Sequence, residues 1–264
     1  MKPICLGEFW WGASPKSEVR VHKQVYPACR GKCEPILGHM LEGIETDDNP
    51  MLQNPAENKD LEIIFEDNYL VVVNKPAEFL SVPGKNIEDS VYTRMKAKYP
   101  EATGPLIVHR LDMSTSGILV LAKDKDVHFH LQKQFIKRKV QKRYVALLEG
   151  LLPEDSGMID LPLRVDLEDR PRQLVCNEHG KRAVTKWEVV ERRANQTLVY
   201  FYPITGRTHQ LRVHAAHTLG LNSPILGDDL YGNRDTRLHL HAQFLQFLHP
   251  VTKETVKIKV DADF

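Results

Sequence analysis

A short polar segment between two apolar runs carries the first side chain that could do chemistry. Asp112 lies in residues 109–117, between the apolar residues 106–108 and 118–122. Short apolar, β-branched runs predict buried strands, and the polar residues that end in Gly117 predict the loop between them. A carboxylate in such a loop is held at a cleft, where it can act as nucleophile, base or ligand. An aspartate that only hydrogen-bonds its own turn would give the same pattern, so spacing alone does not decide.

A run of basic side chains follows this segment. Between residues 127 and 148 the chain has six basic residues and no acidic one: Lys133, Lys137, Arg138, Lys139, Lys142 and Arg143. A charge run by itself is usually a solvated helix face. Here the acidic residues concentrate elsewhere, as in residues 45–67 and 166–169, and the formal net charge is only +1. A basic edge on a nearly neutral protein is what binding to a phosphate backbone requires.

Tyr144 follows the basic run, inside a predicted strand. A tyrosine in a strand most often packs half-buried against its neighbours. On the cleft side, however, its flat ring would offer a surface on which a nucleobase can stack. The pattern of the strand does not determine which face Tyr144 takes, so both interpretations stand.

Residues 205–214 form a third segment with chemical potential. Gly206 permits a tight turn from a strand into a helix, and the first backbone amides of that helix lack partners. Such an end favours a phosphate or a carboxylate, and Arg207 could reach into the cleft and hold Asp112 ionised. Alternatively, its arginines are ordinary surface charges. The predicted helix contains four basic or titratable side chains: Arg207, His209, Arg212 and His214.

Familiar signatures of cofactor and hydrolase sites are absent from the sequence. It has no Gly-x-Gly-x-x-Gly fingerprint, no P-loop, no His-Glu-x-x-His and no Gly-x-Ser-x-Gly elbow. The content of 42% hydrophobic and 27% charged residues is in the ordinary soluble range. No apolar run is long enough to cross a bilayer, and the N-terminus lacks a hydrophobic signal core. We therefore expect a cytoplasmic protein.

Cysteine usage points in the same direction. Few cysteines without a signal peptide predict reduced thiols. Cys29 and Cys33, with Cys5 and either His22 or His39, fall within the loose spacing range of zinc ligands, but no second Cys pair follows. We therefore favour free thiols and expect no metal. The four cysteines are Cys5, Cys29, Cys33 and Cys176.

Turn signals divide the chain into three parts. Residues 45–60 are acidic, contain two prolines and show no apolar period, which predicts a linker. It separates an N-terminal extension of unknown role, residues 1–44, from a main domain, residues 61–264. That domain opens with a predicted hairpin around Asp67-Asn68. Asp89 is then expected to cap a helix that runs to Tyr99.

The rest of the main domain alternates between strands and helices. Asp124 is expected to cap a helix to about Arg138, with Val127, Leu131 and Phe135 on one face. Hairpins interleaved with a few helices predict an α+β fold with a largely antiparallel sheet. Further strands are expected at residues 140–148, 198–204 and 255–260.

Taken together, these segments resemble the RluA family of RNA pseudouridine synthases. Residues 109–123 match the family's central motif, which carries the catalytic aspartate. Residues 143–150 match its tyrosine motif, and residues 204–214 match its arginine motif. The resemblance covers about residues 60–264, and further landmarks occur in the family's order at residues 67–76, 224–232 and 238–242.

The resemblance implies the pseudouridine synthase catalytic fold, with a mixed, mainly antiparallel sheet, flanking helices and a central RNA-binding cleft. By position, it implies that Asp112 is the nucleophile, that Tyr144 stacks on the target uridine and that Arg207 pairs with the Asp112 carboxylate. Arg110 would fill the space of the flipped-out nucleotide. The residues expected to bind RNA are His109, Arg110, Thr115, Lys133, Lys137, Arg138, Lys142, Arg143, His209 and Arg212.

The implied reaction agrees with the missing signatures. Converting uridine to pseudouridine breaks an N-glycosidic bond and rejoins the same ring through carbon without redox change, so we expect no cofactor. Leaving the stack costs the target base a few kcal/mol, offset by ring stacking and the inserted side chain. Asp112 must be ionised to attack, and an arginine partner stabilises that form. The expected partner is ribosomal and/or transfer RNA, with no membrane and a monomeric protein.

Two other functions compete with this hypothesis. A non-catalytic RNA-binding or ribosome-assembly factor could keep the same fold, but it would not need Asp112, Tyr144 and Arg207 together. A hydrolase of small molecules with an aspartate nucleophile lacks a convincing water-activating partner. One departure concerns residues 1–44, which do not look like the S4 RNA-binding domain of many relatives. They resemble the first segment of a subset of longer bacterial members.

Overall fold

The computed structural model describes residues 61–264. The predictions for residues 1–60, namely the N-terminal extension, the linker and the zinc alternative at Cys5, Cys29 and Cys33, lie outside the described residues. Within residues 61–264, no helix is both long and apolar enough to span a bilayer. In the same part of the chain, no three His, Cys, Asp or Glu side chains are grouped so that they could hold a metal ion.

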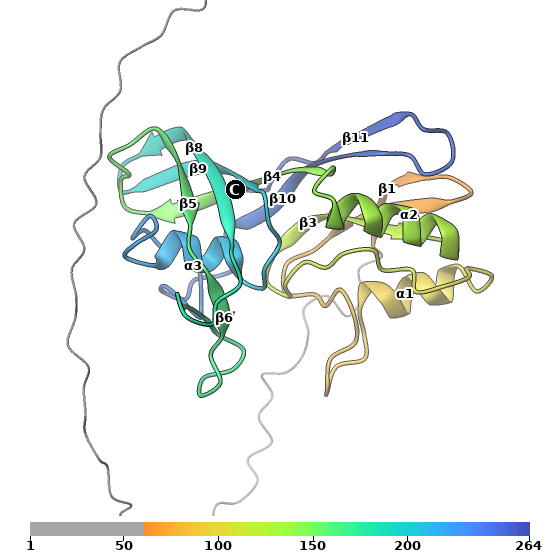
Figure 1. Cartoon of the computed structure of the whole chain (residues 1–264), viewed down its shortest axis with the longest axis horizontal. Coiled ribbons are helices and arrows are strands. Elements are labelled where there is room, and N and C mark those ends of the chain that lie inside the picture. Colours follow the sequence, from red (N-terminus) through yellow and green to blue (C-terminus); the bar gives the residue numbers. More distant parts are fainter. Residues whose placement is uncertain (1–60) are drawn as a thin grey trace, which may run out of the picture. The chain divides into compact units, whose positions relative to one another are not determined.

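Nine strands of the described residues form one sheet, ordered β1-β2-β3-β10-β4-β9-β8-β5, with β11 paired to β10 (Figure 1). β6 and β7 form a separate pair. Only β3 and β10 run parallel in the described ladders, so the mainly antiparallel α+β prediction is confirmed. The strands are β1 Glu62–Glu66, β2 Leu70–Lys75, β3 Ser116–Ala122, β4 Gln141–Glu149, β5 Ser156–Asp160, β6 Leu163–Val165, β7 Gln173–Val175, β8 Val184–Arg193, β9 Gln196–Pro203, β10 Leu240–Leu248 and β11 Thr255–Lys259. The helices are α1 Val91–Lys98, α2 Lys125–Ile136 and α3 Gln210–Ala216.

Local polar contacts fix several element boundaries where the sequence predicts them. The Asp67 carboxylate accepts the backbone N–H groups of Tyr69 and Leu70, which closes the turn between β1 and β2. Asp124 caps α2 by accepting the N–H groups of Asp126 and Val127. Each cap pairs backbone donors that the turn or the first helical turn would otherwise leave free.

Three local predictions are wrong, each for a conformational reason. Ser90, not Asp89, caps α1, because the Ser90 hydroxyl and Thr93 form a reciprocal capping box. Residues 106–108 do not form a strand, since Leu106 has a left-handed φ of 58° and only Ile107 bridges to β3. His209, with φ of 50°, stands just before α3, so neither it nor Arg207 belongs to that helix.

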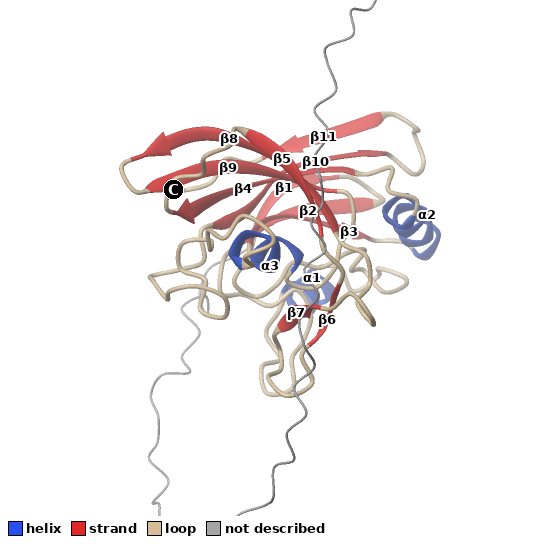
Figure 2. Cartoon of the chain, turned by 60° about the vertical axis from the view of Figure 1, so that its left-hand side comes forward, coloured by secondary structure: helices blue, strands red, loops and turns tan. Residues whose placement is uncertain are grey.

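The sheet has helices on both faces, and the core divides accordingly. Alternate residues of β2 face opposite sides, so Val71 and Val73 pack with α1 while Leu70 and Val72 pack with α2. The third helix covers another part of the sheet through Leu211 and Ala215. Tyr144, on β4, touches both the α1 cluster and the α3 cluster. The central strand β4 therefore presents Tyr144 to the clusters of both helices. In Figure 2, α1 and α3 lie on the same side of the sheet.

Candidate active site

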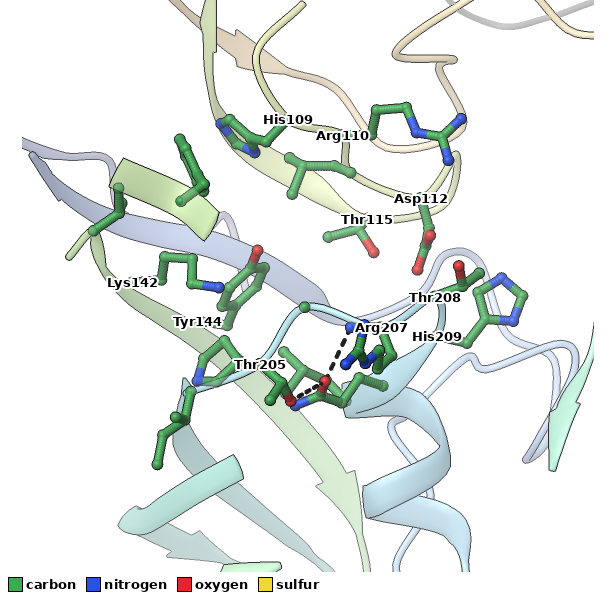
Figure 3. Close-up of a pocket in the computed structure, with 18 of the residues that line it drawn as sticks. His109, Arg110, Asp112, Thr115, Lys142, Tyr144, Thr205, Arg207, Thr208 and His209 are labelled. Carbon is green, nitrogen blue, oxygen red and sulfur yellow. Dashed lines mark hydrogen bonds between the residues drawn. The ribbon is translucent and has the colours of Figure 1, made fainter. Parts of the chain in front are cut away.

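A pocket of about 1070 Å³ brings the three sequence segments together (Figure 3). One wall is the Asp112 segment, the floor includes β4, and the opposite wall is the loop between β9 and α3. The expected site residues that line it are His109, Arg110, Asp112, Thr115, Arg138, Lys142, Tyr144, Arg207, His209 and Arg212.

Asp112 occupies a tight turn at the wall of the pocket. Its carbonyl accepts the N–H of Thr115 at 3.1 Å, and its half-buried carboxylate points into the pocket (Figure 3). Leu111, just before it, is held by the Ser81 hydroxyl, which donates to the Leu111 carbonyl and accepts the Leu111 N–H. The polar loop is thus a fixed mount for the carboxylate.

Lys75 anchors the same turn from inside the protein. The side chain is fully buried, and its ammonium donates to the carbonyls of Pro76, Phe79 and Met113 at 2.8, 2.6 and 2.9 Å. Because burial disfavours the charged form, the pKa of Lys75 falls to about 7, although the nearby charges of Glu78 and Asp112 act in the opposite direction. The prediction from sequence missed this role. The signal available was the position of Lys75 in the landmark at residues 67–76.

Gly117 sets the close approach of β3 to β10 directly behind the turn. Its φ is 113°, a conformation that other residues rarely adopt. A Cβ atom there would lie 2.4 Å from the carbonyl oxygen of Ala242. Gly117 is therefore not the last residue of a loop, as the sequence suggests, but part of the parallel pairing with Ala242.

Tyr144 faces the pocket rather than the opposite side of β4. Burial of the phenol and, next, the negative charge of Asp112 raise the pKa of Tyr144, so the hydroxyl stays neutral. Lys142, two residues earlier on the same face, also lines the pocket, and burial lowers the pKa of its ammonium to about 8. The strand thus places a flat ring and a cation side by side, opposite the Asp112 carboxylate (Figure 3).

His109 is a packing residue of the pocket wall and carries no positive charge at neutral pH. Its Nε2 accepts the N–H of Val120 at 3.2 Å, and its ring stacks on Phe135 with centroids 4.6 Å apart. Burial, helped by the charge of Lys142, lowers the pKa of His109 to about 3. Arg110, by contrast, is exposed at the mouth of the pocket.

The opposite wall is the loop that carries Arg207. Its backbone is held by the buried Gln210 side chain, which accepts from Thr205 Oγ1 at 2.7 Å and from Arg207 N at 3.0 Å. The same amide donates to Val184 O and Thr185 Oγ1. The N–H of Arg207 therefore has an internal partner and does not form the open anion site that the sequence suggests.

The expected pair between Arg207 and Asp112 does not form. Arg207 is exposed and its Nε donates to the carbonyl of Arg182 at 3.2 Å. In the described part of the chain, no Lys, Arg or His nitrogen lies within 4.0 Å of the Asp112 carboxylate. The sequence could not reveal this, because the loop aims its backbone amide, rather than the guanidinium, inward.

Arg212 is the buried arginine of this wall. Its exposed fraction is 2%, and its guanidinium donates to both Asp228 oxygens, at 2.9 and 2.5 Å, and to Asp229 at 2.7 Å. Burial works against this cation, but the two carboxylates hold the pKa of Arg212 above its ordinary value. It is neither a surface charge nor a freely available RNA ligand.

His209 lies between these charges and Asp112. Its Nδ1 is 2.8 Å from the hydroxyl of Tyr231, and the same hydroxyl accepts the N–H of Gln173 at 2.7 Å. Burial lowers the pKa of His209, and the charge of Asp112 partly opposes this. Tyr231 and Asp228 are further contributors that the sequence prediction missed. Both fall in the landmark at residues 224–232.

Three residues expected to bind RNA lie outside the pocket. Arg143 extends from the other face of β4, where its Nε donates to Gln243 and its guanidinium lies 4.4 Å above the Tyr200 ring. This follows from strand alternation, since Lys142 and Tyr144 face the pocket. Lys133 and Lys137 line a second, smaller hollow.

Comparison with known proteins agrees with this geometry. A sequence model of the family described as RNA pseudouridylate synthase matches residues 69–217. A protein of Vibrio vulnificus named dual-specificity RNA pseudouridine synthase RluA is 46% identical over 215 residues, which is 77% of this chain and 84% of that protein. The protein of the same name from Escherichia coli K12 is 45% identical over 219 residues, 80% of this chain and 97% of its own.

Solved structures lead to the same fold. The human RNA pseudouridylate synthase domain containing 1 superposes with a TM-score of 0.65 at 29% identity, covering 78% of this chain and 84% of that one. The human protein named RNA pseudouridylate synthase domain containing 4 superposes with a TM-score of 0.62 at 28% identity, covering 76% of this chain and 88% of that one. Fold, motifs and relatives together place the chain in the RluA family: it is an RNA pseudouridine synthase.

Proposed function

We propose that Asp112 is the nucleophile of this synthase and that the pocket receives a uridine turned out of its RNA. The observation that carries the proposal is that Asp112 and Tyr144 face one pocket, close enough for the carboxylate charge to act on the phenol. A half-buried carboxylate on a clamped turn needs no rearrangement to meet a substrate.

The chemistry to be performed is an isomerisation. The bond from ribose C1′ to uracil N1 breaks and a bond from C1′ to uracil C5 forms. The proton on C5 is lost and N1 gains one, so atoms and electrons balance without an external reactant. The Asp112 carboxylate would hold the separated fragment covalently while the ring turns, by attack on either C1′ or C6.

Two further side chains are suited to hold the flipped nucleotide. The Tyr144 ring, neutral and partly buried, would stack on the uracil. The exposed guanidinium of Arg110 at the mouth would occupy the vacated place in the RNA stack. These contacts offset the cost of unstacking, which is a few kcal/mol.

Of the two arginines in the opposite wall, we assign the electrostatic role to Arg212. Its charge is buried at the pocket wall and fixed by two carboxylates, whereas Arg207 is exposed and bonded to a backbone carbonyl. A fixed, buried cation acts on the pocket through a lower dielectric than an exposed one. Arg207 is then free to contact the RNA backbone.

We further propose that the substrates are uridines in two RNA classes, ribosomal and transfer RNA. The support is the name dual-specificity RNA pseudouridine synthase carried by relatives that match about four fifths of this chain. Because RNA of this kind is recognised by the shape of loops whose bases can be splayed out, one pocket can accept similar loops from different molecules.

The test is conversion of uridine in unmodified transfer RNA and ribosomal RNA by the purified protein and by Asp112→Asn. We expect Asp112→Asn to lose about 10³-fold or more of the activity while keeping its RNA affinity, since the two side chains have almost the same shape. Asp235→Asn, which alters an exposed loop aspartate, is the matched control and should remain active. Wild-type activity in Asp112→Asn would rule out the nucleophile assignment.

Mapping pseudouridine in both RNA classes tests the proposed substrates separately. Conversion at one site in each class is expected. Conversion in only one class would contradict the dual specificity and leave the nucleophile assignment intact.

A further inference from the structure

A second hollow, of about 180 Å³, lies between the C-terminal half of α2 and the turn that joins β10 to β11. We call it the α2 hollow. Among the residues that the structure describes, no acidic one lines it. Its lysines and histidines come from two separate elements: His130, Lys133, Lys137 and Lys139 from α2 and the turn after it, and Lys253 and His249 from the β10–β11 side. The Nε2 of His249 contacts the Asp67 carboxylate at 2.9 Å.

The lysines of the α2 hollow keep their charge available. Lys133, Lys137, Lys139 and Lys253 are exposed, and within residues 61–264 none of them pairs with a carboxylate within 4.0 Å. Two lysines elsewhere in residues 61–264 do pair with a carboxylate: Lys123 with Glu66 at 2.7 Å and Lys259 with Asp261 at 2.8 Å. Four unneutralised ammonium groups around one depression attract an anion with several charges.

The two sides of the α2 hollow are fixed to each other. The Gln134 side chain donates to the carbonyl of Leu248 at 2.7 Å and accepts its N–H at 2.9 Å. On the other side, His249 Nδ1 accepts the N–H groups of Val251 and Thr252, which holds the turn that carries Lys253. The spacing of the basic groups is therefore set before any ligand arrives.

The α2 hollow adjoins the active-site pocket at one residue. Arg138 lines the pocket, whereas its neighbours Lys137 and Lys139 line the α2 hollow. Consecutive Cα atoms are about 3.8 Å apart, so one step along the chain passes from one hollow to the other. A strand of RNA that left the pocket over Arg138 would therefore meet these lysines next.

An exposed aromatic ring completes the surface. Phe129 is 60% exposed on α2, and the Lys133 ammonium lies 5.9 Å above its ring. Aromatic rings beside a basic groove are the means by which proteins hold single-stranded nucleic acid without reading its sequence. An exposed lysine face alone would not need such a ring.

We propose that the α2 hollow is a second RNA anchor, which binds phosphates of the strand that flanks the target uridine. The inference rests on the proposed function, because the pocket fixes where the RNA lies. A phosphodiester strand carries one charge for each nucleotide and so can engage lysines from both α2 and the β10–β11 turn. The anchor acts on affinity for long RNA and leaves the chemical step unchanged.

The test compares K133Q/K253Q, which removes one charge from each side of the α2 hollow, with K98Q/K125Q, which removes two charges from exposed helical lysines elsewhere. The probes are an unmodified transfer RNA transcript and a stem–loop cut from it around the uridine that the wild-type protein converts. Binding is measured over a range of salt concentrations, and kcat/KM on the stem–loop is measured in parallel.

We expect K133Q/K253Q to bind the full transcript roughly tenfold more weakly, with a salt slope smaller by about 1.4 to 1.8 for two lost phosphate contacts. Its kcat/KM on the stem–loop should stay within about twofold of the wild-type value, because no pocket residue is changed. Transcript affinity that matches K98Q/K125Q would overturn the anchor. Failure of the wild-type protein to convert any uridine would instead overturn the proposed function, so the two failures are distinguishable.

Discussion

The two walls of the active-site pocket are held in different ways. The Asp112 turn depends on Lys75, a buried ammonium whose hydrogen bonds within residues 61–264 all go to backbone carbonyls. The opposite wall depends on Gln210, a neutral amide, and on Arg212, whose charge is matched by carboxylates. One wall therefore rests on an unpaired cation whose pKa is near neutral, and the other on groups that keep their charge state at any ordinary pH. The two walls should respond differently to mutation and to pH.

The largest effect is expected from Arg212→Met in the second wall. The Asp228 side chain is fully buried, so removal of the arginine leaves a buried carboxylate without its cation. Breaking a buried ion pair in this way costs about 3–5 kcal/mol. Urea denaturation measures the loss, and activity should fall with it because Arg212 lines the pocket.

The double variant R212M/D228N is the control for that experiment. It removes the stranded charge, so it should recover part of the lost stability but not the activity. If R212M/D228N were fully active, Arg212 would only hold the wall in place and would have no electrostatic role in the pocket.

Lys75→Met tests the first wall. It removes the ammonium donor from the carbonyls of Pro76, Phe79 and Met113, although the Met113 carbonyl still accepts the N–H of Phe79 at 3.2 Å. A buried group left unsatisfied costs about 1–3 kcal/mol, while loss of the ammonium relieves the cost of a buried charge. We expect a net loss of about 2–4 kcal/mol and a fall in kcat, because the turn that carries Asp112 loses its support. Lys98→Met, an exposed lysine on α1, should change neither.

A smaller effect is expected for Gln210→Glu. The carboxylate still accepts from Thr205 and Arg207, but it cannot donate to Val184 O and Thr185 Oγ1. Loss of two buried donors should cost about 1–3 kcal/mol. Thermal unfolding gives the size, and equal stability of Gln210→Glu and wild type would show that the amide donors do not hold this wall.

Contacts that are local in sequence were predictable, within limits. Asp124 is identified as a cap because its partners lie two and three residues away. At α1 the observed cap is one residue later than predicted. Asp89 and Ser90 are both favourable cap residues, and the choice depends on Thr93, whose side chain accepts the backbone N–H of Ser90 and completes the capping box. The strand at residues 106–108 fails for a similar reason, since hydrophobicity does not reveal the positive φ of Leu106.

Contacts that are distant in sequence explain the errors at the site. The motif at residues 204–214 contains two arginines, and spacing cannot tell which one is buried. Asp228, which selects Arg212, lies 16 residues further along the chain. Likewise, Lys75 reaches Met113 across 38 residues, so no local pattern shows that it supports the Asp112 turn. Asp112 and Tyr144 could be picked out by the family resemblance, whereas their supports required the structure.

A change of pH alone should affect the wall held by Lys75 and not the wall held by Gln210 and Arg212. The pKa of Lys75 is about 7 in the folded protein and 10.5 as the ordinary value. Between these limits the unfolded chain binds the additional proton, so the free energy of unfolding that Lys75 contributes rises with pH. The slope is at most about 1.4 kcal/mol per pH unit, and the contribution is lost as the pH falls towards 7. Urea denaturation of both proteins, the wild type and Lys75→Met, at pH 7, 8 and 9 measures this effect. The free energy of unfolding of the wild-type protein should rise relative to that of Lys75→Met by up to about 1.4 kcal/mol per pH unit.

If Lys75→Met does not fold, the pKa of Lys75 can be measured directly in the wild-type protein. An NMR titration of the Lys75 side chain should show a midpoint near 7, because the charges of Glu78 and Asp112 offset only part of the effect of its burial. A midpoint near 10 would mean that the Asp112 turn rests on a permanently charged lysine. Arg212, whose guanidinium does not titrate in this range, would then differ from Lys75 only in its partners, and the two walls would share one response to pH.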